Sequence, residues 1–168
     1  MRKFRREKDV KDEIKKLLTK HGWFHWMPPA NGFGKGGTSD HNAIKGERGA
    51  GQFMAIEAKH TKTGKGTSTL QRDFLFNVEK NGGFAFVVNE NNIMWLAVFL
   101  QAYDNAAAAV AQALSEGKSE QEALIAAEEH NVMLHNAQAI LVEGWLQPEP
   151  VGIAVEKAPR ADAVQPEA

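Results

Sequence analysis

Near the start of the chain, apolar residues recur at helical spacing. Four of them lie four, three and one positions apart and so form one stripe on a helix: Val10, Ile14, Leu17 and Leu18. This stripe predicts a helix over residues 5–21, ended by Gly22. The next segment, 23–27, is rich in aromatic residues and stops at two prolines, which predicts a short strand.

Farther along, strand-like and helix-like segments alternate. Residues 41–44, 52–59 and 84–88 are interpreted as strands, the last of them buried. Between the second and third of these, Thr67 or Ser68 can cap a helix that runs to about residue 80, with Leu70, Phe74 and Val78 on one face. The apolar run 93–98 is interpreted as one more strand.

From about residue 99 the sequence changes character. The alanine-rich stretch 106–114 predicts a helix, which Gly117 should break. Ser119 and Glu122 have the spacing of a capping box, which predicts a second helix through about residue 142. The end of the chain is rich in proline, alanine and glutamate and is expected to be a mobile tail. These features divide the chain into three parts, which are a core (1–98), a helical extension (99–146) and a tail (147–168).

The amino-acid composition also indicates a class of binding partner. The 168 residues allow one domain of ordinary size, and the absence of cysteine excludes a disulfide scaffold and a cysteine nucleophile. The formal charge of −1 hides a division of charge. Residues 1–80 hold 17 Lys and Arg against 9 Asp and Glu, a balance of +8, whereas residues 81–168 have a balance of −9. A basic half suggests a polyanion partner, although the charges can also serve only to keep the protein soluble.

The strand over residues 52–59 carries the most distinctive chemistry. Glu57 and Lys59 are two positions apart in a strand, so their side chains leave the same face. Asp40 begins the preceding strand, so if the two strands pair, two carboxylates and an ammonium converge at one place. Two carboxylates and the intervening backbone carbonyl of Ala58 form an all-oxygen site suited to Mg²⁺ or Mn²⁺, which can activate water and polarise a phosphodiester.

The order of these residues resembles the active-site signature of the PD-(D/E)xK nuclease superfamily, and more narrowly its VRR-NUC branch. The shared features are a helix with a glutamate, a glycine-containing loop ending in aspartate, E-x-K on a strand, a helix that opens with glutamine, and a Gly-Gly strand. In this sequence they are Glu13, Asn31 to Asp40, Glu57-Ala58-Lys59, Thr69-Leu70-Gln71 and Gly82 to Val88. They span roughly residues 5–98. Ser39 departs from the family, which usually has proline before the aspartate.

The resemblance implies an α/β fold with a restriction-endonuclease-like core, in which helices flank a central mixed β-sheet. It also implies metal-dependent hydrolysis of phosphodiester bonds in DNA, by a structure-selective endonuclease of phage or repair type whose partner is branched or structured DNA. Asp40, Glu57, Ala58 and Glu13 are then expected at the metal, Lys59 as the catalytic lysine and Gln71 as a supporting residue. The helical extension is not part of the resemblance.

Basic residues in the loops are candidates for phosphate contacts. Lys35 lies in a glycine-rich loop whose G-x-G-x-x-G pattern lacks the strand and helix of a dinucleotide fold. Lys62 and Lys65 lie in the loop after the E-x-K strand and can also contact the nucleic-acid backbone. His41 is a candidate for a water or phosphate contact.

Simpler interpretations stay open for several residues. Glu57 and Lys59 can be an ion pair at a sheet edge, Glu13 part of a solvated helix face, and Gln71 an ordinary helix residue. Trp23 and Trp26 can stack on bases or pack in the core. At the level of function, the alternatives to a DNA nuclease are an inactive nucleic-acid-binding module of the same fold and a ribonuclease.

Further expectations concern the surroundings of the protein. The charged N-terminus lacks an apolar signal core, and the longest apolar run, 93–100, is too short to span a bilayer. An intracellular, cytoplasmic protein without a membrane segment is therefore expected. A homodimer that uses the helical extension is one further arrangement that the sequence allows.

Overall fold

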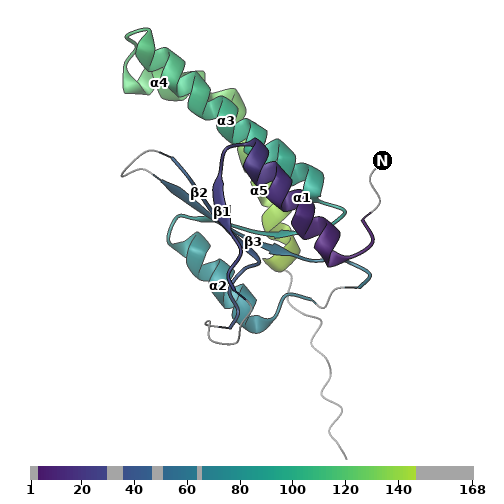
Figure 1. The fold of residues 1–168 in the computed structure, drawn as a ribbon. Helices are drawn as coiled ribbons and strands as arrows, with labels where there is room; N and C mark the ends of the chain where they lie inside the picture. The colour runs from purple at the N-terminus through teal and green to yellow at the C-terminus, as the bar shows by residue number, and fades with distance from the viewer. Residues whose placement is uncertain (1–3, 30–35, 47–50, 64–65, 147–168) are drawn as a thin grey trace, which may run out of the picture.

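The computed structural model describes residues 4–29, 36–46, 51–63 and 66–146 of the chain. Within these residues it is an α/β fold, in which four strands form one sheet and five helices flank it (Figure 1). In chain order the elements are α1 (Glu7–Lys20), β1 (Phe24–Trp26), β2 (His41–Lys45), β3 (Gln52–Ala58), α2 (Thr69–Lys80), β4 (Phe84–Val88), α3 (Ile93–Ser115), α4 (Glu120–Ala126) and α5 (Glu128–Leu146).

The sheet is mixed, as expected. Its strand order is β1-β2-β3-β4, with antiparallel pairing between β1 and β2 and between β2 and β3, and parallel pairing between β3 and β4. The parallel pair is joined by α2, which gives the β-α-β connection that parallel strands require. Residues 54–58 of β3 are all buried because helices cover this strand on both faces.

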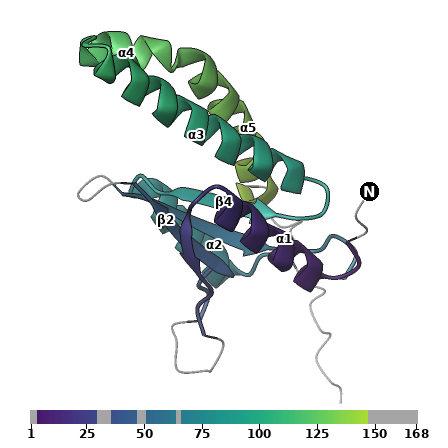
Figure 2. The ribbon, with the colours of Figure 1, turned by 45° about the horizontal axis from the view of Figure 1, so that its top comes forward.

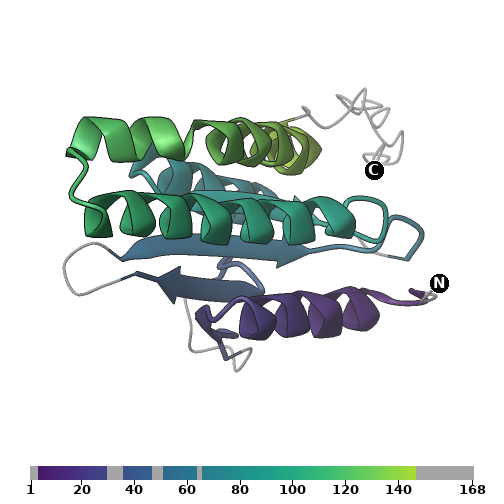
Figure 3. The same cartoon turned by 90° about the horizontal axis from the view of Figure 1, so that it is seen from above.

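The helices lie on two sides of the sheet. α2 packs against β3 and β4 on one face, whereas α1, α3 and α5 lie on the other (Figure 2). Figure 3 shows α3 between α1 and α5. On this side Phe86 of β4 meets Phe99 of α3 edge-on, with ring centroids 4.9 Å apart. The predicted stripe of α1 contributes Val10, Ile14 and Leu18, which are fully buried.

The interpretation of residues 93–98 as a strand is wrong, because they form the first turns of α3. The turn before them starts the helix. Asn92 accepts from the backbone N–H of Asn89 at 2.7 Å and donates to the carbonyl of Val87 at 3.0 Å. An unbroken apolar run fits a buried strand and a buried helix equally well, and here Leu96 and Phe99 show the three-residue spacing of a buried helix face.

The helical extension begins inside this same helix. α3 crosses the expected boundary at residues 98 and 99 without interruption and ends before Gly117, which has a positive φ of 78°. Ser119 caps α4 through the expected capping box with Glu122. The single helix expected from there to residue 142 is instead divided into α4 and α5 at Ala127, a bend at which Ala127 stays buried.

The distal part of α3 and α4 extends past the sheet in Figures 1 and 2. In the part of the chain that is described, α3 is the one helix long and apolar enough to cross a membrane by length and composition alone. Its side chains at positions 96, 99 and 100 are fully buried, and 33% of its apolar window is buried in the fold. The expected tail, 147–168, lies outside the described residues.

Candidate metal and catalytic site

Asp40 and Glu57 face one another across two paired strands. His41 pairs with Ile56 in the antiparallel register of β2 and β3, so Asp40, one residue earlier, continues that register opposite Glu57. A hydrogen bond from the backbone N–H of Ala58 to Asp40 Oδ2, 3.0 Å long, fixes the aspartate there. The strand pairing therefore brings the two carboxylates together on the face of the sheet that α2 covers.

Ser39 helps to hold the loop that delivers Asp40. Its hydroxyl is buried and donates to Asn42 Oδ1 at 2.8 Å. This hydrogen bond ties the residue before Asp40 to the strand that follows it.

Glu57 is a buried carboxylate that is only partly satisfied. Its side chain is 1% exposed, and Oε1 accepts from Lys59 Nζ at 2.7 Å and from Gln71 Nε2. Oε2 has no hydrogen-bond partner among the described residues. Burial, with the negative charge of Asp40, raises the pKa of Glu57 to about 7, although the ammonium groups of Lys59 and Lys11 oppose the shift.

Gln71 is fixed in place by the start of α2. Ser68 caps this helix by accepting from the backbone N–H of Gln71, and Gln71 Oε1 accepts from the backbone N–H of Ser68 at 2.9 Å. The same amide oxygen lies 3.4 Å from Lys59 Nζ, and the amide nitrogen donates to Glu57. The capping box thereby holds the glutamine side chain against both members of the ion pair, which is the position expected of a supporting residue.

Lys11 of α1 reaches this cluster, and the sequence interpretation missed it. Its Nζ lies 2.8 Å from Asp40 Oδ1 and 2.9 Å from Glu7 Oε1. Burial alone would lower the pKa of Lys11, but its hydrogen bonds to Asp40 and Glu7 outweigh that effect and the pKa is raised. The available signal was the spacing of Glu7 and Lys11, four positions apart beside the buried stripe of α1.

The expectation that Glu13 lies at the metal is not met. Glu13 is two positions from Lys11, which is about 200° around a helix, so it points away from the face that contacts Asp40. It pairs with Lys16 at 3.7 Å and lines a cavity of about 390 Å³ between α1 and α3, together with Phe4 and Glu90.

His41 is also not a candidate for contact with a substrate. Side chains alternate along β2, so His41 leaves the face opposite to Asp40, where it is 1% exposed. Neither ring nitrogen has a hydrogen-bond partner among the described residues. Burial lowers the pKa of His41 to about 4 against the raising effect of Asp40, so the ring is neutral near pH 7.

The tryptophans and lysines that are candidates for nucleic-acid contact differ in their exposure. Trp23 is buried and packs against Tyr103, with ring centroids 5.2 Å apart, whereas Trp26 is exposed. Lys62 is exposed in the loop after β3. Lys35 and Lys65 lie outside the described residues.

The donor set fits a hard divalent cation. Mg²⁺ is usually held by one or two carboxylates and completes its shell with water and substrate phosphate oxygens. Asp40 and Glu57 supply two carboxylates, and Glu57 Oε2 is the oxygen that has no partner among the residues that are described. No group of three or more His, Asp or Glu side chains suited to a metal occurs in the described ranges, so such an ion would depend on this pair, on backbone oxygen and on water.

Comparisons with known proteins do not assign a family to the chain. No family model matches it, and neither the curated proteins nor the solved structures contain a significant match.

Proposed function

We propose that this chain is a divalent-metal-dependent nuclease with a restriction-endonuclease-like core that hydrolyses phosphodiester bonds in DNA. The observation that carries the proposal is the buried carboxylate of Glu57, opposite Asp40, with one oxygen that has no hydrogen-bond partner in the part of the chain that the structure describes. A protein retains an uncompensated buried carboxylate oxygen at a cost in stability, so a function in ligand binding is the simplest account of it.

In this proposal Asp40 and Glu57 hold Mg²⁺ or Mn²⁺, with the Ala58 carbonyl as a third oxygen. The bound ion would supply charge neutralisation at the phosphate and at the leaving oxygen. Lys59 holds Glu57 through its ion pair at 2.7 Å and is 16% exposed in its side chain, so its ammonium can also face a substrate phosphate. Gln71 fixes the orientation of both side chains.

Lys11 has a different part in this arrangement. Its ammonium lies on Asp40 Oδ1 and balances the negative charge of the cluster when no metal is bound. A divalent cation that uses this oxygen must displace Lys11, which is then free to contact the phosphate backbone.

A cleavage assay tests the proposal directly. Purified protein is incubated with single-stranded, duplex and branched DNA in Mg²⁺, Mn²⁺ or EDTA. We expect cleavage with metal only, and a loss of at least about 100-fold in Asp40→Asn and Lys59→Ala, because each change removes a group from the reacting site. The matched control is Asp73→Asn, the same substitution at an exposed position of α2, which should keep its activity. Cleavage in EDTA, or full activity in Asp40→Asn, contradicts the proposal.

A second candidate function has one observation in its favour. Both oxygens of Asp40 are already engaged by Lys11 and by the Ala58 amide, so much of the cluster is satisfied without metal. This favours a nucleic-acid-binding module of the same fold, which predicts salt-sensitive DNA binding and no cleavage with any metal. A ribonuclease is separated from both by repeating the assay on RNA.

A further inference from the structure

An exposed aromatic surface lies beside the candidate site, and the proposed chemistry does not use it. Phe24 and Trp26 of β1 are 71% and 41% exposed, and Ile44 of β2, which pairs with Phe24, is 40% exposed. The rings of Phe24 and Trp26 lie 5.9 Å apart, and Trp26 lies 6.3 Å from the half-buried ring of Phe53. We call Phe24, Trp26 and Ile44 the β1 platform.

The platform is exposed because of the way α2 is placed. This helix packs against β3 and β4, at the other end of the strand order from β1. Among the helices of the described ranges, none therefore covers the apolar side chains on the outer part of the same sheet face. Contiguous exposed apolar side chains of this kind on a soluble domain indicate a binding surface.

The strand register places this platform next to the carboxylates. Trp26 pairs with Asn42, and Asp40 lies two positions before Asn42, where it continues the register of β2, so both side chains leave the same face. Two residues along a strand correspond to about 7 Å. The row of the sheet that contains Trp26 is thus adjacent to the row in which Asp40 faces Glu57.

Charge on the other side of β1 complements this apolar surface. Lys15, Lys16 and Lys20 of α1, with Asp12 and Thr19, line a shallow and open hollow. The hydroxyl of Thr19 lies 3.1 Å from His25 Nε2, so the hollow borders β1 on the face opposite to Trp26. β1 is the first strand of the sheet order, so lysines and aromatic rings flank the same sheet edge.

An unpaired nucleic-acid strand carries, side by side, the two kinds of group that these surfaces can bind, which are phosphates and exposed bases. Its phosphates are attracted to lysine, and its bases stack on exposed aromatic rings. A base pair inside a duplex presents no free face to such a ring. We propose that the β1 platform binds the bases of an unpaired DNA strand beside the phosphate that Asp40 and Glu57 address, so that the substrate class is single-stranded or frayed DNA. This inference rests on the proposed function for the identity of the cutting site.

Binding in EDTA tests the platform without turnover. Fluorescence anisotropy is measured for a labelled oligothymidylate and for a labelled duplex, with full-length wild type, Trp26→Ala and Phe24→Ala. Because one stacked base is lost, we expect binding of the oligothymidylate to weaken roughly 5- to 100-fold in each variant, with duplex binding unchanged. Trp26→Phe, which keeps an aromatic ring, should recover most of the affinity.

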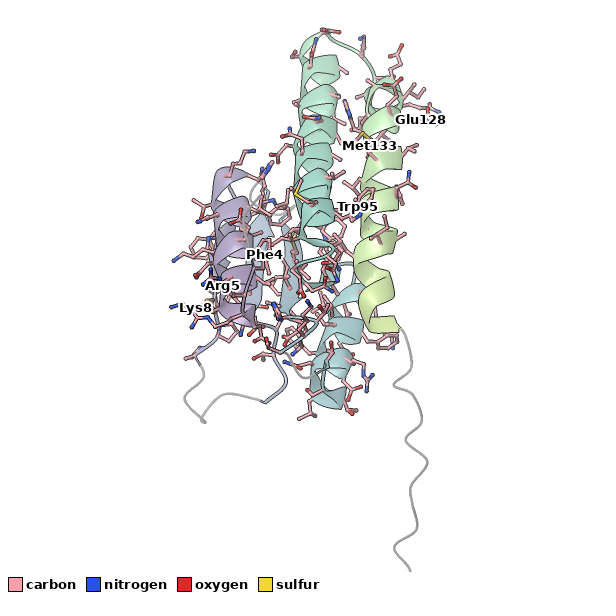
Figure 4. The ribbon with its side chains drawn as sticks, turned by 90° about the vertical axis from the view of Figure 1, so that its right-hand side faces the viewer. Phe4, Arg5, Lys8, Trp95, Glu128 and Met133 are labelled. Atoms are coloured by element: carbon pink, nitrogen blue, oxygen red, sulfur yellow. The ribbon has the colours of Figure 1, made fainter. Side chains whose placement is uncertain are left out.

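The matched control is Trp95 of α3, labelled in Figure 4, which is 39% exposed and lies on another element. Trp95→Ala should bind the oligothymidylate as wild type does. Circular dichroism and urea unfolding show whether each variant is folded. Lys15→Gln and Lys20→Gln should weaken the binding of both DNA forms and reduce its dependence on salt.

The outcomes separate this inference from the proposed function. If binding of the oligothymidylate depends on the aromatic rings but no metal supports cleavage, the platform is supported and the proposed nuclease function is wrong. Metal-dependent cleavage with unchanged oligothymidylate binding in Trp26→Ala and Phe24→Ala overturns the platform alone. If Trp26→Ala instead converts a dimer to a monomer in sedimentation and leaves DNA binding unchanged, the surface is a contact with a second copy and the inference is wrong.

Discussion

Replacing Glu57 by glutamine tests whether the candidate site is maintained at the expense of stability. Glu57→Gln keeps the shape of the side chain and mimics the protonated acid. In the wild type, the pKa of Glu57 is raised from 4.5 to about 7, first by burial and then by Asp40. The folded protein therefore retains a proton on Glu57 in a pH range in which the unfolded chain has already lost it.

The sign and size of the effect follow from this shift. Stability associated with a raised carboxyl pKa is fully present below pH 4.5 and is lost as the pH rises through about 7. A rise in the pKa of Glu57 from 4.5 to about 7 corresponds to about 3 kcal/mol. The free energy of unfolding of Glu57→Gln minus that of wild type should therefore increase by about this amount between pH 4.5 and pH 8. The buried amide N–H group that the substitution introduces can cost about 1 kcal/mol, but that cost is the same at every pH.

Urea denaturation in EDTA at several pH values from 4.5 to 8 gives the difference between variant and wild type. His41 titrates in an overlapping range, but it is present in both proteins and cancels. The control is Glu128→Gln at an exposed position of α5 (Figure 4), which should show no such trend. Added Mn²⁺ should stabilise wild type and not Glu57→Gln. A difference between the two proteins that does not change with pH would refute the reasoning about Glu57.

Three further predictions concern other parts of the molecule. Because burial lowers the pKa of His41 to about 4, the free energy of unfolding of wild type should fall by about 3 kcal/mol relative to that of His41→Leu as the pH goes from 6.5 to 4 in the same urea series, since the opposite contribution of Glu57 is common to both proteins and cancels. Gly37→Ala should lower the free energy of unfolding in urea by about 1–3 kcal/mol, because φ is 88° and the new Cβ would lie 2.4 Å from Leu70 Cβ. The control is Gly66→Ala, whose new Cβ would lie in open space and which should change the free energy of unfolding little. Lys11→Gln should bind Mn²⁺ about tenfold more tightly in calorimetry, since no ammonium then has to leave Asp40. Weaker binding in this variant would contradict the displacement of Lys11 by the metal.

Much of the fold follows from local patterns in the sequence. The stripe through Val10 and Ile14 predicts α1 because only one face of that helix is buried. Ser68 and Ser119 predict helix starts because each hydroxyl accepts an N–H group that the first turn leaves free. The meeting of Asp40 and Glu57 was predictable because strand alternation and pairing of the two strands decide it.

The errors have a physical cause as well. Residues 93–98 are apolar at every position, so no periodicity distinguishes strand from helix, and the helix becomes evident only from the burial of Leu96 and Phe99 in the fold. The resemblance implies Glu13 at the metal only from its place on the first helix. Which side of α1 faces Asp40 depends on tertiary packing, and that packing selects Lys11. The bend at Ala127 is likewise set by contacts between helices, since alanine favours helix on both sides of it.

The two lysines of the site have unequal freedom. Lys59 is held by Glu57 and lies near Gln71 Oε1, and the capping box of α2 fixes that glutamine in turn. Lys11 is held by two carboxylates that are themselves partly exposed, Asp40 and Glu7. A cation that enters the site can therefore displace Lys11 at a lower cost than Lys59, because Glu7 still offers Lys11 a partner. If the proposed function holds, the arrangement keeps one ammonium beside the reacting phosphate and releases the other toward the DNA backbone.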